Sequence, residues 1–349
     1  NQKTHLSKTI NPFMEGYVLW VDSFAQVGLL ISYYFFLSNS RWKDLITGIT
    51  IGLVLLLKQT VFPLILILLL YFLLSRWAKT KVFKFIIGVS FCIILLILWV
   101  VAKGILKEFL YWTFTFNLTI FAQMGRKYGS IGQIARIIPL FLPTLIFLFF
   151  YFKKKTFEVK IDLLSIFFLG SLFFAFARFD YVHLQPSLPF SVLLSSYAFY
   201  YLAKDSKTLL VVYVLSCLVL NYFFISVLVG SKVYFFGNKE RLLVDAVEKY
   251  RNNGKVFTVG TTPHIYYLTN TLPPGNVFSF QFPWFMKKVD SIIYTELVKD
   301  PPNVVIIDRS SMVSGIKLIE YMPNILDYLE NNFKTLEFID KTEVMVKDR

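Results

Sequence analysis

Cysteine and histidine are scarce in this sequence. The two cysteines, Cys92 and Cys217, each lie inside an apolar run, which excludes a disulfide framework and argues against a zinc site. The three histidines, His5, His183 and His264, are far apart and have no metal-ligand spacing. We also find no internal repeat and no Gly-rich phosphate loop. The sequence therefore gives no indication of a zinc-binding protein or of a nucleotide-binding protein with a Gly-rich phosphate loop.

Acidic residues are few relative to basic ones. There are 22 Asp and Glu against 36 Lys and Arg, a formal net charge of +14, yet charged residues make up only 17% of the chain. The basic residues occur in short clusters between apolar runs, as they do in the cytoplasmic loops of membrane proteins. We therefore do not expect a nucleic-acid partner.

Long apolar runs dominate the first two thirds of the chain. Hydrophobic residues make up 56% of the sequence, and Phe alone contributes 38. The pattern predicts a polytopic α-helical membrane protein, with a transmembrane domain at 1–229 and an extracytoplasmic α/β domain at 230–349. We expect about eight spans, near 17–37, 43–57, 61–75, 85–103, 137–152, 161–177, 189–203 and 208–229.

Basic clusters follow the first, third, fifth and seventh of these runs. They would all lie on one side, which the positive-inside rule makes cytoplasmic. The predicted localisation is the cell membrane, multi-pass, with the C-terminal domain outside. The aromatic stretch 105–121 is expected to form a helix along the outer surface.

The C-terminal region alternates two kinds of pattern. Asn238 is a possible cap for a helix to about Asn252, and 314–332 also has a helical pattern. Val256–Val259 and Val304–Ile307 are short β-rich runs typical of a buried sheet, and 334–347 is expected to be a terminal strand pair. These pieces predict a small α/β domain.

Two candidate sites stand out. The segment Arg178–Pro189 brings together Arg178, Asp180, Tyr181 and His183, and Arg and His are both suited to binding phosphate. The alternative is a simple Arg178–Asp180 pair beside a proline turn.

Lys58, followed by Gln59, ends an apolar run and could contact a lipid phosphate as a point charge. The alternative is a lysine that extends from a helix end towards water.

Four further charged residues have less defined roles. Glu15 is a possible base or orienting carboxylate, or a solvated helix start. Asp22 lies inside an apolar run, where an unpaired carboxylate is unfavourable, so we expect it to face other helices. Arg126 and Lys127 could clamp a phosphate or anchor their loop to lipid headgroups.

Three motifs resemble those of the GT-C superfamily of membrane glycosyltransferases, in the bacterial protein-mannosyltransferase and aminoarabinose-transferase group. They are Gly48–Thr60 (GITIGLVLLLKQT), the Arg178–Pro189 turn, and Thr262–Thr269 (TPHIYYLT) in the tail. Each motif alone is of modest specificity, and their order along about 12–349 carries the resemblance.

The resemblance implies transfer of a sugar from a polyprenyl-phosphate donor to an envelope acceptor, which could be a lipid, a glycan or a protein. It implies that Lys58 and Arg178 bind the donor phosphate, with His183 nearby and with Asp180, Tyr181 and Gln59 in support. Membrane lipids would be further partners. Metal is not uniformly required in the superfamily, so a divalent metal is possible but unsupported.

The sequence departs from the family in one respect. The family's catalytic acidic residue follows the first span, and we expect this chain, which begins at Asn1, to lack that loop. The catalytic residue is therefore unassigned, with Glu15 as the substitute candidate. Two alternatives remain open: a non-catalytic carrier or flippase for a lipid-linked sugar, and a structural assembly partner. The scarcity of polar side chains in four of the expected spans argues against a substrate tunnel.

Overall fold

The chain divides into two compact units. The first comprises Asn1–Phe116 with Arg126–Ser231, and the second comprises Asn117–Gly125 with Lys232–Arg349. This division falls beside the predicted boundary at 229/230, but the grouping of Asn117–Gly125 with the C-terminal unit was not predicted. The computed structural model describes residues 21–75, 79–154, 158–205, 207–208, 210–211, 214–215, 218, 222, 237–261, 263–274 and 281–348.

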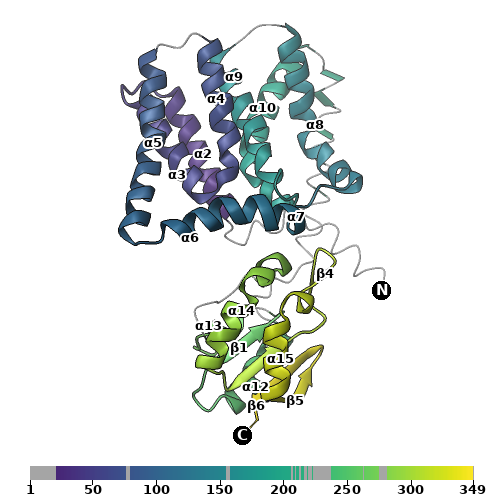
Figure 1. Ribbon diagram of the computed structural model, residues 1–349. Helices are drawn as coiled ribbons and strands as arrows, with labels where there is room; N and C mark the ends of the chain where they lie inside the picture. The colour runs from purple at the N-terminus through teal and green to yellow at the C-terminus, as the bar shows by residue number, and fades with distance from the viewer. Residues whose placement is uncertain are drawn as a thin grey trace. The chain divides into compact units, whose positions relative to one another are not determined.

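The first unit is a bundle of helices (Figure 1). Its main helices are α2 (Val21–Leu37), α3 (Lys43–Leu57), α4 (Phe62–Leu74), α5 (Lys79–Ala102), α8 (Ile131–Lys154), α9 (Val159–Ser171) and α10 (Leu188–Asp205). Residues 106–121 are helical as expected: α6 (Leu106–Leu110) and η3 (Tyr111–Thr115) belong to this unit, whereas η4 (Asn117–Phe121) belongs to the segment grouped with the second unit. Both η3 and η4 are π-helical turns. In Figure 1, α6 runs across one end of the bundle.

Glycines bring α3 and α5 into close contact. A Cβ atom on Gly48 would lie 2.2 Å from the carbonyl oxygen of Phe85, and one on Gly88 would lie 2.4 Å from that of Leu45. Only glycine fits where two helix backbones approach this closely. The G-I-T-I-G stretch of α3 therefore has a packing role.

Aromatic side chains fill the centre of the helical unit. Phe36 contacts Phe72, Phe85 and Phe167, with ring centroids 5.6, 6.1 and 6.2 Å away. Phe167 also packs on Phe190, at 5.3 Å. All five rings are buried. Tilted, stacked and edge-to-face ring pairs of this kind stabilise a core beyond the area they bury.

The prediction of about eight spans is wrong. Among the described residues, α5 (Lys79–Ala102, 24 residues) is the one helix long and apolar enough to cross a membrane, and it corresponds to the expected span 85–103. The other apolar helices are shorter, among them Val21–Leu37 and Gln59–Leu74. A span needs about 20 apolar residues, and several of the expected runs were too short. The last expected span, 208–229, lies largely outside the described residues.

The predicted multi-pass localisation is overturned by the same finding. One long apolar helix is weak evidence for any membrane crossing, since helices in other settings pass the same test of length and composition. The cytoplasmic and outer sides were assigned by counting spans. That assignment, including an outer position for the C-terminal domain, therefore has no support from the described residues.

The second unit contains a mixed sheet, so the α/β character expected for the C-terminal region is present. The strands are β1 (Val256–Val259), β2 (Val304–Ile307), β5 (Phe333–Ile339) and β6 (Thr342–Lys347), in the order β1-β2-β6-β5. β1 and β2 are parallel, while β6 is antiparallel to both β2 and β5. Every residue of β1 and β2 is buried, as expected for strands covered on both faces.

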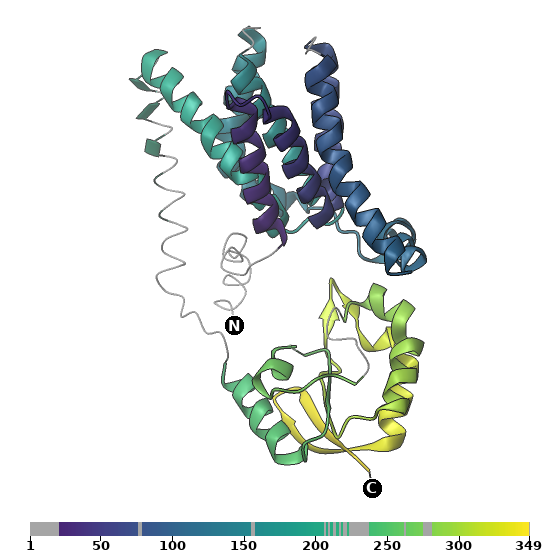
Figure 2. The ribbon, with the colours of Figure 1, turned by 90° about the vertical axis from the view of Figure 1, so that its left-hand side faces the viewer.

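Helices cover this sheet. In Figure 2, α12 (Asn238–Tyr250) and α14 (Pro283–Lys299) lie on opposite sides of the strands. The shorter α13 is His264–Leu268, and α15 (Pro323–Asn332) packs against α14. Residues 314–332, expected to be helical throughout, instead form part of the small β3–β4 pair (Met312–Val313 and Ile316–Lys317) and the turn η7 (Ile319–Tyr321) before α15.

Candidate functional site

Three short 3₁₀ segments lie together at one end of the helical unit, beside α2 and α3. They are η2 (Gln59–Val61), η5 (Leu172–Ala175) and η6 (Tyr181–Ser187), and η5 contacts both of the others while η6 contacts α2. Ser23 of α2 donates a hydrogen bond to Gln185 of η6, at 3.0 Å. Tight 3₁₀ turns break the helical pattern here and place side chains from distant parts of the chain together.

Lys58 lies at the break between α3 and η2. Its backbone is extended (φ −154°, ψ 117°), and its amide donates to the carbonyl of Val54, which closes the last turn of α3. The Lys58 side chain reaches Asp22 in the first turn of α2, with Nζ 2.5 Å from Oδ1. It also lies over the Phe174 ring, 5.3 Å from the ring centroid.

His183 completes a three-residue cluster with this pair. Its Nδ1 lies 3.1 Å from Asp22 Oδ2 and 2.9 Å from Lys58 Nζ. Because Nδ1 carries either a proton or a lone pair, it can donate to Asp22 or accept from Lys58, but not both at once. The protonation states of the three groups are therefore linked. We call Asp22, Lys58 and His183 the buried triad.

The buried triad is largely shielded from water. The side chain of Asp22 is 3% exposed, and those of Lys58 and His183 are each 19% exposed. Burial lowers the pKa of the Lys58 ammonium below its usual value although a carboxylate lies beside it. Burial opposes ionisation of Asp22 too, but the hydrogen bond with His183 and the charge of Lys58 outweigh it, so the pKa of Asp22 lies below its usual value.

A second charged cluster follows η5. Arg178 Nε is 2.8 Å from Asp180 Oδ2, and Lys127 Nζ is 3.3 Å from Asp180 Oδ1. The backbones of Lys127 and Arg178 form a parallel β-bridge, and the amide of Phe179 donates to the carbonyl of Lys127 at 2.7 Å. This loop pairing fixes two cations around one carboxylate.

Arg126 extends this cluster. Its guanidinium carbon is 4.8 Å from the centroid of the Phe176 ring and 5.2 Å from that of Tyr128. Contacts of this kind hold a cation against an aromatic face. We call Arg126, Lys127, Arg178 and Asp180 the cationic loop cluster, which carries three positive charges and one negative charge.

Unpaired buried polar atoms gather on the same segments. Thr60 Oγ1, Arg126 Nε and Tyr181 Oη are buried and have no hydrogen-bond partner among the described residues. An unpaired buried polar group costs about 1–3 kcal/mol, so native proteins keep few of them. Asp44 Oδ1 and Thr342 Oγ1 share this property elsewhere among the described residues, so it is not confined to these segments.

The predicted site residues are distributed between the two clusters. Lys58 and His183 meet in the buried triad, whereas Arg178 and Asp180 pair with each other, which was the alternative considered for them. Tyr181 begins η6, and Gln59 is exposed at the start of η2. Glu15 lies outside the described residues.

Asp22 was not predicted to belong to the site. The expectation was only that it would face other helices. The sequence did hold a signal, because a carboxylate within an apolar helix requires a partner. Its partners lie 36 and 161 positions away along the chain, so spacing could not identify them.

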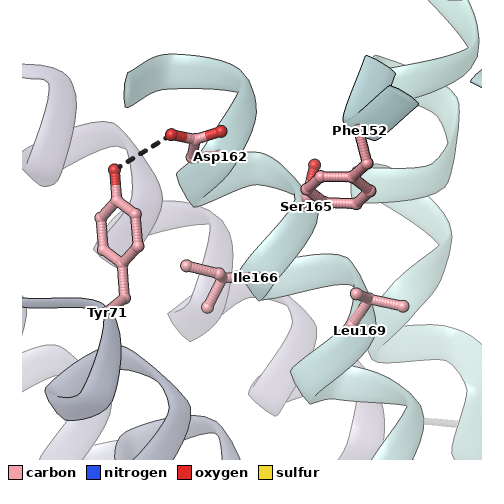
Figure 3. Close-up of a pocket in the computed structure, with 6 residues that line it drawn as sticks. All are labelled: Tyr71, Phe152, Asp162, Ser165, Ile166 and Leu169. Atoms are coloured by element: carbon pink, nitrogen blue, oxygen red, sulfur yellow. Dashed lines mark hydrogen bonds between the residues drawn. The ribbon is translucent and has the colours of Figure 1, made fainter. Parts of the chain in front are cut away.

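A separate pocket of about 220 Å³ lies between α4, α8 and α9 (Figure 3). It is lined by Tyr71, Phe152, Asp162, Ser165, Ile166 and Leu169. Asp162 accepts hydrogen bonds from Tyr151, at 2.8 Å, and from Tyr71, at 3.3 Å. Its polar groups are thus bonded within the protein, and the open wall is hydrocarbon.

No group of three His, Cys, Asp or Glu side chains suited to a metal ion occurs within the described part of the chain.

Comparison of the sequence with models of known families, and with curated proteins, finds no match. The resemblance to the GT-C glycosyltransferases therefore stays a prediction that depends on the three motifs quoted above.

Proposed function

We propose that this chain is a glycosyltransferase that moves a sugar from a polyprenyl-phosphate donor to an envelope acceptor. The observation that carries the proposal is the cationic loop cluster and the neighbouring buried triad, set at one end of a helical unit whose core is apolar. Charged groups in such a setting are costly and usually serve a ligand.

The charge and geometry of the cationic loop cluster suit a phosphate. Arg178 presents a planar guanidinium, which binds phosphate oxygens in pairs, and Lys127 supplies a second charge. In the structure the Asp180 carboxylate pairs with both cations, 2.8 Å from Arg178 and 3.3 Å from Lys127. Since the side chain of Asp180 is 34% exposed, it can turn towards solvent when a phosphate takes its place.

The proposed reaction is a displacement at the anomeric carbon of the sugar. An acceptor hydroxyl or amine attacks this carbon, and the carbon–oxygen bond to the phosphate breaks. The lipid phosphate leaves with the bonding electron pair, and the acceptor proton passes to a base. Positive charges around the leaving phosphate stabilise the charge that develops as the bond breaks.

Within this proposal the buried triad has a positioning role. Asp22 holds the Lys58 ammonium and the His183 ring through contacts of 2.5 and 3.1 Å. Lys58 would add a point charge near the phosphate. Because Asp22 is engaged by both partners, we do not assign it as the base. The base is left unassigned, and Glu15 keeps its place as the candidate.

The test is transfer of a labelled sugar from a polyprenyl-phosphate donor to envelope extract, with wild type and Arg178→Gln. Loss of this guanidinium should lower turnover about 100-fold, the usual effect of removing one donor to a developing charge. Arg178→Lys should recover only part of the activity, because a point charge cannot bind bidentately. The matched control is Lys103→Met, which removes an exposed cation outside both clusters.

Unchanged turnover in Arg178→Gln would contradict the phosphate role. Donor binding without transfer to any acceptor would instead favour the non-catalytic carrier.

A further inference from the structure

The carboxyl ends of two parallel strands bring polar loops together in the C-terminal unit. β1 ends at Val259 and β2 at Ile307, and these two residues pair with each other. Gly260 follows β1 directly, at φ +65°, and a Cβ atom there would lie 2.6 Å from the Asp308 carbonyl oxygen and 2.7 Å from Ser311 Cβ. Because only glycine permits this approach, the loops that follow the two strands are in contact.

Strand β6 begins at the same edge of the sheet. Ile307 pairs with Glu343 in antiparallel register, so Asp308 and Thr342 are the next residues beyond that pair. The β2 and β6 residues two positions further in belong to one apolar cluster with α12. Since side chains alternate between the faces of a sheet, this pattern assigns Asp308 and Thr342 to the face that α12 covers.

Oxygen atoms at this edge have hydrogen-bonding capacity left. Asp308 Oδ1 accepts from the amide and the hydroxyl of Ser310, at 2.9 and 2.7 Å, while Oδ2 accepts nothing from the residues that the structure describes. Thr342 is fully buried, and its Oγ1 has no partner in that same part of the chain. Water or a ligand usually completes the bonding of such a group. Two half-buried hydroxyl groups, of Thr261 and Ser311, lie in the adjoining loops.

We call Gly260, Thr261, Asp308, Ser311 and Thr342 the sheet-edge cluster. The charge around it does not favour an anion, because acidic side chains outnumber basic ones. The acidic ones are Glu240, Asp308, Glu330, Asp340 and Glu343, and the basic ones are Lys239, Arg309 and Lys341. Arg309 is bound to two of these carboxylates, at 2.7 and 2.8 Å, and Lys239 lies 3.7 Å from a third. A local excess of negative charge in a chain of net charge +14 repels phosphate.

Hydroxyl groups around one carboxylate suit a neutral sugar. Adjacent hydroxyls of a sugar can donate to Asp308 Oδ2 and accept from the Thr342 hydroxyl, and hydrogen bonds to a carboxylate are the stronger kind. The loop after Gly260 leads directly into α13, which presents His264 and Tyr267, both exposed. Tyr267 is 82% exposed, and its ring offers an apolar surface for the C–H face of a sugar.

We propose that the sheet-edge cluster binds a neutral sugar unit of a glycan, with Asp308 and Thr342 bonding its hydroxyl groups and Tyr267 lying against its ring. Ligands of α/β domains commonly bind outside the carboxyl ends of parallel strands. This inference rests on the proposed function and deepens it: of the lipid, glycan and protein acceptors left open there, it selects a glycan.

Binding of methyl α-mannoside and methyl β-glucoside to the full chain tests the proposal, followed by saturation-transfer NMR. The detergent is a polyoxyethylene ether, because alkyl-glycoside detergents would compete for the site. Wild type should bind at least one of the two glycosides saturably. Asp308→Asn and Thr342→Val should weaken that binding about tenfold. The exposed controls Asp327→Asn and Thr295→Val should leave it unchanged.

The Thr342→Val variant separates a binding role from a structural one. Valine keeps the shape of threonine and removes only the hydroxyl, which has no partner among the described residues. The ligand-free variant should therefore be as stable as wild type or more stable. Loss of stability in the ligand-free variant would show that the hydroxyl serves the fold, and would contradict its role in binding.

A second measurement uses wild type alone. Saturating glycoside should slow amide hydrogen exchange in peptides that cover residues 256–261 and 304–311. Protection confined to other peptides would place the sugar elsewhere and refute the sheet-edge cluster.

Two further results would overturn the inference. One is the absence of saturable glycoside binding by wild type. The other is binding of inorganic phosphate, in place of a glycoside, that is lost in Asp308→Asn. The proposed function can fail separately, because Arg178→Gln should abolish sugar transfer and leave glycoside binding unchanged. Transfer to a lipid or protein acceptor without any glycoside binding would refute the sugar site alone.

Discussion

Removal of Lys58 should destabilise the helical unit by much more than removal of an exposed lysine. In Lys58→Met the Asp22 carboxylate, 3% exposed, keeps only His183 as a partner. Breaking one side of a buried ion pair costs about 3–5 kcal/mol. Because His183 still pairs with Asp22, we expect Lys58→Met to lower the free energy of unfolding by about 3 kcal/mol, near the lower limit of this range.

The reverse change should cost less. In Asp22→Asn the remaining Lys58 side chain is 19% exposed, and burial already lowers the pKa of its ammonium. Lys58 can therefore lose its proton or reach water, and we expect Asp22→Asn to lower the free energy of unfolding by about 2 kcal/mol. The double variant removes both charges and should cost no more than Asp22→Asn alone, which corresponds to a coupling energy of about 3 kcal/mol.

The assay is denaturant unfolding of the full chain in mild detergent, followed by far-ultraviolet circular dichroism. Lys103→Met controls for loss of an exposed lysine and should change stability by less than about 0.5 kcal/mol. If the loss of stability in the double variant equals the sum of the two single losses to within about 0.5 kcal/mol, Asp22 and Lys58 do not stabilise each other. That result would refute the buried triad.

Three further predictions concern other parts of the molecule. Buried Asp290 accepts hydrogen bonds from the amides of Asn324 and Ile325 in the first turn of α15, so Asp290→Asn should lower the free energy of unfolding by about 3 kcal/mol. The exposed control Asp327→Asn should leave it nearly unchanged in the same unfolding assay. Gly48→Ala should destabilise by about 1–3 kcal/mol because its Cβ meets the α5 backbone at 2.2 Å, while Gly132→Ala, with open space around it, should be neutral or stabilising. Burial raises the pKa of Tyr33 from 10.0 to about 12, so its neutral hydroxyl contributes stability below pH 10 that is lost as the pH rises through about 12. The difference in unfolding free energy between wild type and Tyr33→Phe should shift by about 2.7 kcal/mol across that range. A difference independent of pH would contradict this raised pKa.

Local pattern was sufficient for much of the C-terminal unit. The strands expected at Val256–Val259 and Val304–Ile307 are confirmed at those residues, and the expected terminal pair is β5 and β6. Short β-branched runs form buried parallel strands for local reasons, so a sequence can reveal them. The helix expected after an Asn238 cap is present as α12, but Gly237 occupies the cap position and Asn238 is the first helical residue.

Hydropathy was not sufficient for the helical unit. It located the apolar segments, but it did not give the length of the helices they form or the partners they pack against. The run from Gly48 onwards breaks at Lys58, and α3 and α4 have 15 and 13 residues. Helices pack their faces against one another, as α3 and α5 do at Gly48 and Gly88, and apolar composition alone does not distinguish this packing from a membrane span.

The sequence by itself determined the chemical types of the candidate site: a lysine after an apolar run, and an Arg-Asp-Tyr-His segment. The tertiary structure alone decided their partners. Asp22 lies 36 positions from Lys58 and 161 from His183, and only the packing of α2 against both α3 and η6 brings the carboxylate to the other two. The bridge between Lys127 and Arg178 is likewise a contact between loops. Such pairings follow from the burial of charge in a folded interior, where each charged group requires a partner, and a linear pattern does not specify which one it will be.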